Sequence, residues 1–238
     1  MIEVLLESIL NKIHQKSFSA PKQLAEELGR LIIRDDLSPD QYSYISSKIF
    51  NSELNLFAFV NANNLEKDRN ETNLRKEILE IISDYMQVCR YSLINYLEFI
   101  KNSSLTIYKT DYSMVVKESA LKIIVKMLQS YDATILDSVI QCNRLSQILL
   151  DEIKLIKPSA SVKGRIWQIL GELIRKFPEQ MLLLIVEIQE VSFYGVKSMM
   201  EDGKNVELKT LTGLLQLTRA ILDNDKAAYP ETERRTSL

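Results

Sequence analysis

The chain has 238 residues, which is enough to bury a substantial core in one or two domains. Its 30 Lys and Arg nearly balance its 32 Asp and Glu, so no overall field draws it toward nucleic acid or acidic lipid, and any basic surface must be local. With only six Gly and five Pro it has few of the residues that strands and hairpins need at turns, which favours helices.

The first third of the chain predicts four helices, near residues 2–15, 21–34, 39–50 and 53–63. Pro21 and Pro39 suit the first turns of the second and third helices, and Ser38 is the expected N-cap of the third. The stretch 61–73 is the most polar part of the chain, and we expect it to be an exposed loop.

No segment is suited to secretion or to crossing a membrane. The first helix carries Glu3 and Glu7 where a signal peptide has basic residues. The longest apolar run, 181–186, is far shorter than the roughly 20 residues that span a bilayer. Cys89 and Cys142 fall in apolar helical patterns and are expected to be free buried thiols. We therefore expect a soluble intracellular protein with no membrane partner.

Helical periodicity is clearest from Ser113 onward. Residues 113–131 place their large apolar side chains on one face, and residues 161–177 do the same. The second stretch holds Trp167, which is expected to pack between neighbouring repeats. Proline lacks an N–H and disfavours helical backbone in the residue before it, so Phe177-Pro178 ends one helix and begins another that reaches residue 201.

The apolar ridges of these helices recur along the chain. The set Ile123, Ile124, Met127, Leu128 and Tyr131 returns 46 residues later as Ile169, Leu170, Leu173, Ile174 and Phe177. A weaker copy follows after 45 residues as Leu214, Leu215, Thr218, Arg219 and Leu222. An earlier copy lies 42 residues before the first set, as Ile81, Ile82, Tyr85, Met86 and Cys89. Other helical stretches, at about 91–103, 134–153 and 178–201, lie between the copies. Two helices in each 42–46 residues is the period of HEAT and armadillo repeats.

We therefore predict an all-α fold, an α-solenoid of antiparallel helix pairs of the HEAT or armadillo type. One helix pair cannot cover both of its apolar faces by itself, so neighbouring pairs must stack. The predicted repeat domain spans residues 1–222, with irregular helices over 1–64 and regular repeats over 65–222. Residues 223–238 are expected to form a flexible tail.

The sequence offers no motif for catalysis. His14, the only histidine, is predicted to lie on the polar side of the first helix and leaves no His-pair metal site or Ser-His triad. Cys89 and Cys142 have no CxxC companion. Glycine-rich phosphate motifs and the kinase signatures HRD and DFG do not occur in the sequence. We expect no catalytic residue, metal, cofactor or small-molecule substrate. The terminal RRTSL makes Thr236 and Ser237 candidate phosphorylation sites.

The segment KLIKPSASVKGR holds a local cluster of cations. Lys154, Lys157, Lys163 and Arg165 lie within twelve residues, around an expected inter-repeat loop at Pro158. If they project together, they would contact phosphate or an acidic partner, and four DNA-phosphate contacts would give a log–log salt slope of about −3 to −4. The alternative is a solvated loop with cations favourably placed near a helix C-terminus.

Five segments, taken in order, resemble the extreme N-terminal region of the DNA-dependent protein kinase catalytic subunits, a family of phosphatidylinositol-3-kinase-related kinases. They are SKIFNSELNLFAFV (47–60), LRKEILEII (74–82), ESALKIIVKMLQSY (118–131), GRIWQILGELIRKFPEQM (164–181) and ELKTLTGLLQLTRAIL (207–222). The resemblance spans about 47–222, and residues 1–46 are more divergent.

This resemblance implies a nuclear protein whose helical arm supports binding of DNA ends, of the Ku heterodimer and of other repair proteins in non-homologous end joining. The family's kinase domain lies far downstream of this region, so no catalytic residue carries over. Two other hypotheses stay open. In one, the chain is a general HEAT-repeat protein–protein adaptor unrelated to repair. In the other, it is an enzyme that uses scattered carboxylates.

Overall fold

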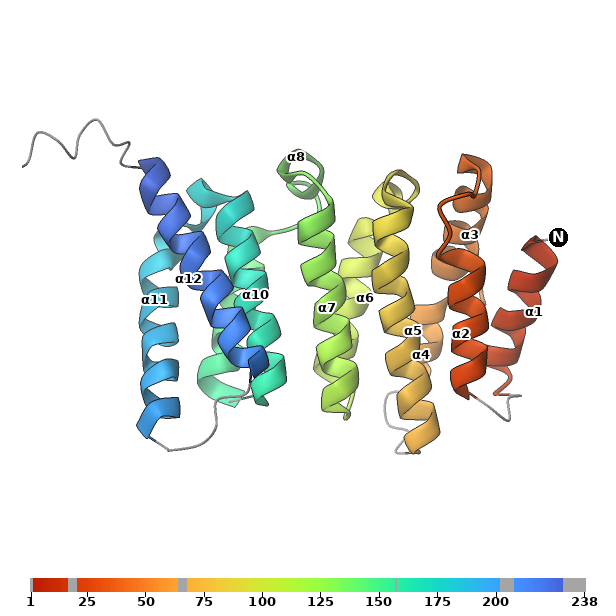
Figure 1. Ribbon diagram of the computed structural model, residues 1–238, viewed down its shortest axis with the longest axis horizontal. Helices are drawn as coiled ribbons and strands as arrows, with labels where there is room; N and C mark the ends of the chain where they lie inside the picture. Colours follow the sequence, from red (N-terminus) through yellow and green to blue (C-terminus); the bar gives the residue numbers. More distant parts are fainter. Residues whose placement is uncertain (1, 17–20, 64–67, 157, 202–207, 229–238) are drawn as a thin grey trace, which may run out of the picture. The chain divides into compact units, whose positions relative to one another are not determined.

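The computed structural model describes residues 2–16, 21–63, 68–156, 158–201 and 208–228. Over these ranges the chain forms helices and no β-strand, and its fold is the predicted all-α helical-repeat solenoid (Figure 1). It divides into two compact units, Met1–Tyr131 and Asp132–Leu238, which are described separately. The boundary between them follows Tyr131, the last residue of the ridge that begins at Ile123.

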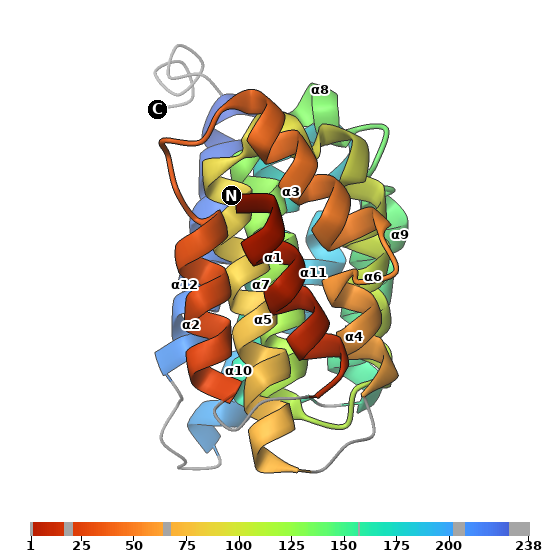
Figure 2. The same cartoon turned by 90° about the vertical axis from the view of Figure 1, so that its right-hand side faces the viewer.

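The first unit is built from α-helices and one 3₁₀ segment. Their bounds are α1 (Ile2–His14), α2 (Pro21–Ile32), α3 (Pro39–Asn51), α4 (Leu56–Ala62), α5 (Arg69–Val88), η1 (Arg90–Tyr96), α6 (Leu97–Thr110) and α7 (Met114–Ser130). Helices α2, α5 and α7 lie side by side, and α6 packs against α7 as its antiparallel partner (Figure 1). Helix α1 contacts α2, α3 and α4 (Figure 2). Each helix thus has at least one neighbour for its apolar face.

The helix starts in this unit follow local capping chemistry. Ser38 caps α3, as predicted, because its Oγ accepts from Gln41 N–H at 3.3 Å while the Gln41 side chain accepts from Ser38 N–H at 2.8 Å. Pro21 and Pro39 open α2 and α3 as expected. Asp68 caps α5 by accepting from two backbone N–H groups. The predicted loop over 61–73 is therefore wrong at its C-terminal end, since a helix already begins at Arg69.

The second unit is built around two helix pairs. Its elements are α8 (Ala133–Leu136), α9 (Cys142–Asp151), the π-helical turn η2 (Glu152–Ile156), α10 (Ala160–Lys176), α11 (Pro178–Glu201) and α12 (Leu208–Ala228). Helix α12 packs along α10, and α11 packs along α9. The predicted break at Phe177-Pro178 is confirmed, because α10 ends at Lys176 and α11 begins at Pro178. Helix α12 continues past residue 222, and the predicted tail beyond residue 228 lies outside the described residues.

The recurrent ridges explain the cores. In the copies on α5, α7 and α10, and at the residues that follow those helices, every predicted ridge residue is buried. Trp167 on α10 is 1% exposed, in line with a packing role. Both cysteines are free and buried, as predicted. His14 is half-buried rather than on a polar face, and its ring contacts Phe59 edge-on with 5.7 Å between ring centroids.

The fourth copy of the ridge, on α12, is turned away from the core. Leu214 is buried, but Leu215 and Leu222 are more than half exposed, and Leu217 and Ile221 face inward in their place. Backbone contact with α10 explains this rotation. A Cβ built on Gly213 would stand 3.0 Å from both Cα and C of Gly164, and closer still to its carbonyl oxygen. The two helices therefore cross at a glycine contact that the ridge pattern did not predict.

Candidate interaction surface

Three of the four predicted contact cations, Lys154, Lys163 and Arg165, lie on either side of the turn between α9 and α10 in the second unit. Lys154 lies in the π-helical turn that extends α9, and Lys163 and Arg165 lie near the start of α10. Lys157 is outside the described residues. The cations therefore share one region of the unit, at the junction of two helices.

Lys154 has an acidic partner within the same unit. Its Nζ lies 2.5 Å from Glu187 Oε1 on α11, and both side chains are partly exposed. This ion pair links the end of α9 to α11 and offsets part of the positive charge of Lys154. The exposed pair contributes about 0–1 kcal/mol to stability, so an incoming phosphate can compete for the lysine at little cost.

Lys163 and Arg165 are separated by two positions on α10. Such residues point in different directions around a helix, so the two side chains share one end of α10 but not one face. Both are half-buried, and Arg165 donates from Nη1 to Gln168 Oε1 at 2.8 Å. They stand near the N-terminus of α10, where the helix dipole already favours an anion. The predicted alternative, cations near a helix C-terminus, applies to Lys154 and not to these two.

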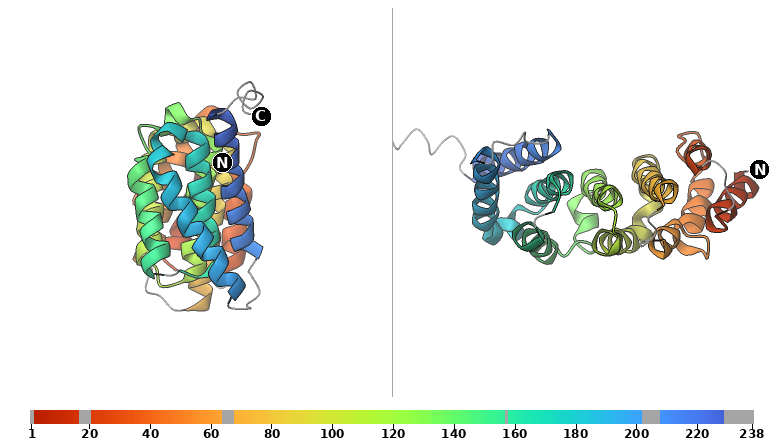
Figure 3. Two further views of the ribbon diagram at one scale, coloured as in Figure 1. Left: turned by 90° about the vertical axis from the view of Figure 1, so that its left-hand side faces the viewer. Right: turned by 90° about the horizontal axis from the view of Figure 1, so that it is seen from below.

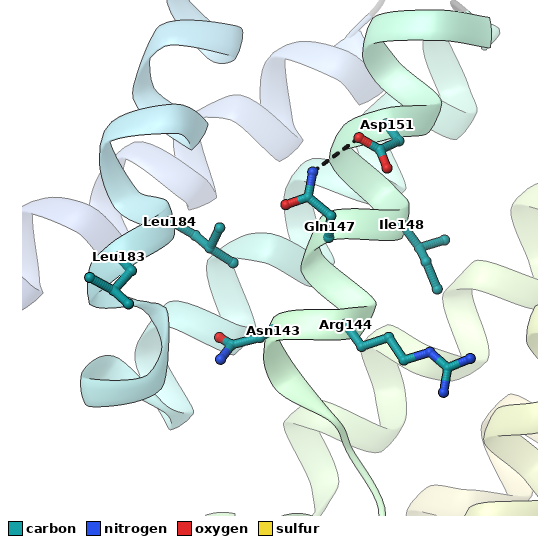
Figure 4. Close-up of a pocket in the computed structure, with 7 residues that line it drawn as sticks. All are labelled: Asn143, Arg144, Gln147, Ile148, Asp151, Leu183 and Leu184. Carbon is teal, nitrogen blue, oxygen red and sulfur yellow. Dashed lines mark hydrogen bonds between the residues drawn. The ribbon is translucent and has the colours of Figure 1, made fainter.

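A shallow groove runs between α9 and α11 (Figure 4). Its volume is about 560 Å³, and its lining residues are Asn143, Arg144, Gln147, Ile148, Asp151, Leu183 and Leu184. Asn143 and Gln147 project toward the two leucines, and Gln147 Nε2 donates to Asp151 Oδ1 at 3.0 Å. This groove was not predicted from the sequence. The signal was the run MLLLIV, which places leucines on more than one face of α11.

The most deeply buried charges of the described residues form an ion pair in the first unit. Arg75 Nη1 on α5 lies 2.5 Å from Asp111 Oδ2, and neither side chain is exposed. Asp111 Oδ1 also accepts from Ser113 N–H at 2.8 Å, and burial raises the pKa of the Asp111 carboxyl. The pair ties α5 to the turn before α7, which is a structural role. It leaves no open face for a substrate.

The shifted pKa values of the two cysteine thiols are also explained by burial. Burial raises the pKa of the Cys89 thiol to about 12 and that of the Cys142 thiol to about 11, which makes both poor nucleophiles. Among the described residues, no group of three His, Cys, Asp or Glu side chains is arranged to hold a metal ion. No described helix is long and apolar enough to cross a bilayer. Thr236 and Ser237 lie outside the described residues.

Comparison with known families identifies the chain's relatives. The model of the N-terminal region of DNA-PKcs, the DNA-dependent protein kinase catalytic subunit, matches residues 43–236. The chain belongs to this DNA-PKcs N-terminal family. The resemblance noted in the five helical segments is thus confirmed, and the matched range includes parts of both structural units.

A curated relative extends this result. The DNA-dependent protein kinase catalytic subunit of Dictyostelium discoideum is 20% identical over 163 residues, which cover 66% of this chain and 4% of that protein. The chain thus corresponds to a small part of its relative's length. No solved structure matches the chain. The DNA-PKcs N-terminal family model describes a region distinct from the kinase domain, so it assigns no catalytic role to Lys154, Lys163 or Arg165.

Proposed function

We propose that this chain is a non-catalytic scaffold segment of a DNA-dependent protein kinase catalytic subunit. In this role it supports binding of DNA ends and the Ku heterodimer during double-strand break repair by non-homologous end joining, in the nucleus. The observation that carries the proposal is the family match over residues 43–236, on a fold of stacked helix pairs. Stacked pairs offer extended surfaces for partners, which is how helical-repeat proteins commonly bind.

The interior chemistry supports a scaffold role. The buried ion pair Arg75–Asp111 and the buried thiols are enclosed by helices, where they hold the fold and do not meet a ligand. A scaffold needs rigid helices, because partner-binding side chains must keep their spacing. Packed ridges on α5, α7 and α10 supply this rigidity through apolar burial, at about 1.5–3 kcal/mol for each large side chain.

The cations at the junction of α9 and α10 are the proposed contact with DNA phosphates. Lys163 and Arg165 would act together with the N-terminal dipole of α10, and Lys154 would exchange Glu187 for a phosphate. Lys157 completes the predicted set. Because each phosphate contact releases about one counterion, loss of two contacts lowers the salt slope of binding by about 2.

The test is binding of the chain to blunt duplex ends and to Ku, measured by fluorescence anisotropy over a range of salt concentrations. We expect K163E/R165E to weaken binding to DNA ends and to flatten its salt dependence. The matched control is K12E/K109E, which makes the same charge change at two exposed lysines of the first unit. If K163E/R165E and the control bind alike, these two residues do not contact DNA.

A protein-only contact is the second candidate, and the groove between α9 and α11 favours it. Apolar side chains at Leu183 and Leu184 suit a protein partner better than a phosphate backbone. In that case Ku binds without DNA, and L183E weakens it while K163E/R165E does not. Recovery of cargo without any repair factor, and no response to DNA damage, would instead favour a general adaptor.

A further inference from the structure

Helix α11 carries a stripe of side chains on the side opposite its buried face. At 100° per residue, the stripe comprises Glu179, Leu182, Leu183, Val186, Glu190, Phe193, Tyr194 and Lys197, all of which are exposed. The five apolar members are between 63% and 89% exposed. The buried face is marked by Met181 and Ile188, each 0% exposed. We call the exposed set the outer stripe of α11.

On α5, the exposed positions are polar, among them Asp84 and Gln87. Helix α12 also exposes apolar side chains, at Leu211, Leu215 and Leu222, but these are 43–62% exposed, less than every apolar member of the outer stripe. A helix that is apolar on both sides needs cover on both sides. Helix α11 is contacted by α9, α10 and α12, and the left panel of Figure 3 looks onto it from outside the unit. The outer stripe stays exposed beside these neighbours. Phe193 and Tyr194 already pack on each other there, with 6.1 Å between their ring centroids.

The outer stripe is complementary to itself in the antiparallel direction. Glu179 and Lys197 are each nine positions from Ile188. A second α11 that runs antiparallel about that point therefore places its Lys197 opposite Glu179 of the first. The same reversal sets Leu183 opposite Phe193. Glu179 and Lys197 are about 27 Å apart along the helix at 1.5 Å per residue, so the complementarity extends over most of α11.

We propose that α11 binds the α11 of a second copy of this chain, antiparallel about a two-fold axis that passes between Val186 and Glu190. In this dimer the two leucines of each copy pack under the two aromatic rings of the other. Glu179 of each copy forms an ion pair with Lys197 of its partner copy. Such a self-complementary patch is what a two-fold interface requires. The proposal does not depend on DNA or Ku binding.

The first test is the mass of the chain in solution, measured by sedimentation over about 1–200 µM, a range that suits interfaces of modest area. We expect a monomer–dimer equilibrium. L183E should raise the dissociation constant about 30-fold or more, as loss of a central apolar contact does. V4E on α1 is the matched control, because Val4 is equally apolar and 73% exposed, and it should not change the dimer. A monomer at every concentration overturns the proposal.

Charge exchange tests the direction of the pairing. Each substitution enters the dimer twice, so E179K and K197E alone should each weaken it, and the double variant E179K/K197E should restore it. A partner helix other than α11 of a second copy would not show this restoration. The two Glu190 carboxylates lie near the proposed axis and repel each other, so E190Q should tighten the dimer. A dimer that ignores these changes would lie on another surface and would overturn the assignment.

Disulfide trapping gives a geometric answer. In the proposed pairing Leu183 lies against Phe193 of the other copy, whereas the two Leu183 residues are about 15 Å apart along the axes, too far for a disulfide. Oxidation should therefore link L183C/F193C into covalent dimers and leave L183C alone unlinked. Efficient linking of L183C alone would mean parallel pairing and would refute the model. Cys89 and Cys142 are buried and should not interfere.

Discussion

The glycine contact between α10 and α12 predicts that Gly→Ala at Gly213 lowers stability, although the same substitution usually raises the stability of a helix. In a solvent-exposed helix, Gly→Ala stabilises by about 1 kcal/mol, because alanine loses less backbone freedom on folding. At Gly213 the new Cβ would meet backbone atoms of Gly164 at 3.0 Å or less. Backbone atoms cannot move aside as a side chain can, so α10 and α12 must separate. G213A should therefore destabilise the second unit.

The magnitude follows from two opposing terms. Overpacking costs typically 1–3 kcal/mol, and a clash with backbone belongs at the upper end of that range. Subtraction of the helix-propensity gain leaves a net loss of about 2 kcal/mol. For a protein of this size, that loss lowers the melting temperature by roughly 4–8 °C.

The control is Gly29 on α2. A Cβ there would stand 3.7 Å or more from side-chain atoms of Ile81 and Ile33, which is ordinary van der Waals contact. G29A should therefore stabilise the first unit by about 1 kcal/mol. Both variants are compared by urea unfolding and by thermal melting followed by circular dichroism. If G213A is as stable as the wild type or more so, α10 and α12 do not touch at their backbones and the account of the turned ridge fails.

Three further predictions concern buried and half-buried groups. D111A should lower the free energy of unfolding by about 3–5 kcal/mol, because it removes the carboxylate that balances the buried charge of Arg75. R75M/D111L should be nearly neutral in urea unfolding, and equal losses from the two variants would refute this. Burial alone would raise the pKa of Glu80, but hydrogen bonds from Lys122 and Ser119 outweigh it and hold the pKa below its ordinary value. Stability from Glu80 is therefore present above the unfolded pKa and lost as the pH falls through the folded one, so E80Q should flatten the acid limb of a stability–pH profile. Cys89 and Cys142 should react with a thiol reagent only at the rate of unfolding; fast labelling in native buffer would contradict their burial.

Helix boundaries were predictable where a proline marks them. Ser38-Pro39 and Phe177-Pro178 act through capping and through the missing proline N–H, both within a few residues of the boundary. The start of α5 was missed because Asp68, its cap, lies within a run of polar residues that resembles a loop. Polarity alone does not distinguish an exposed first turn of a helix from an irregular segment.

Ridge periodicity predicted the cores on α5, α7 and α10 but not the rotation of α12. The ridge on α12 has Thr218 and Arg219 where the other copies have large apolar side chains, so burial of that face would bring in polar groups. Gly213 provides an alternative, since a helix without a Cβ at the contact can approach α10 more closely. Which face of α12 is buried depends on the shape of α10, and the apolar pattern of α12 alone does not contain that information.

The arrangement of the candidate contact cations was hard to predict, and the reason is physical. Lys154, Lys163 and Arg165 were grouped because they are close in sequence, but positions two apart on a helix point different ways, and Lys154 is joined to Glu187 from a helix 33 residues later. Sequence proximity is a good guide to a shared end of a helix and a poor guide to a shared face.

The apolar run of helix α11 supplies side chains to an exposed face as well as to the core. The run MLLLIV reads as core, since helices of soluble proteins usually bury their leucines. Consecutive leucines on a helix, however, point in directions 100° apart, so one run supplies apolar side chains to more than one face. Only Met181 of the first three is buried, and Leu182 and Leu183 face outward. The outward face of α11 is therefore an exposed apolar patch, which in soluble proteins commonly marks an interaction site. For this reason the dimer is tested by substitutions on α11 and not at the cations beside α10.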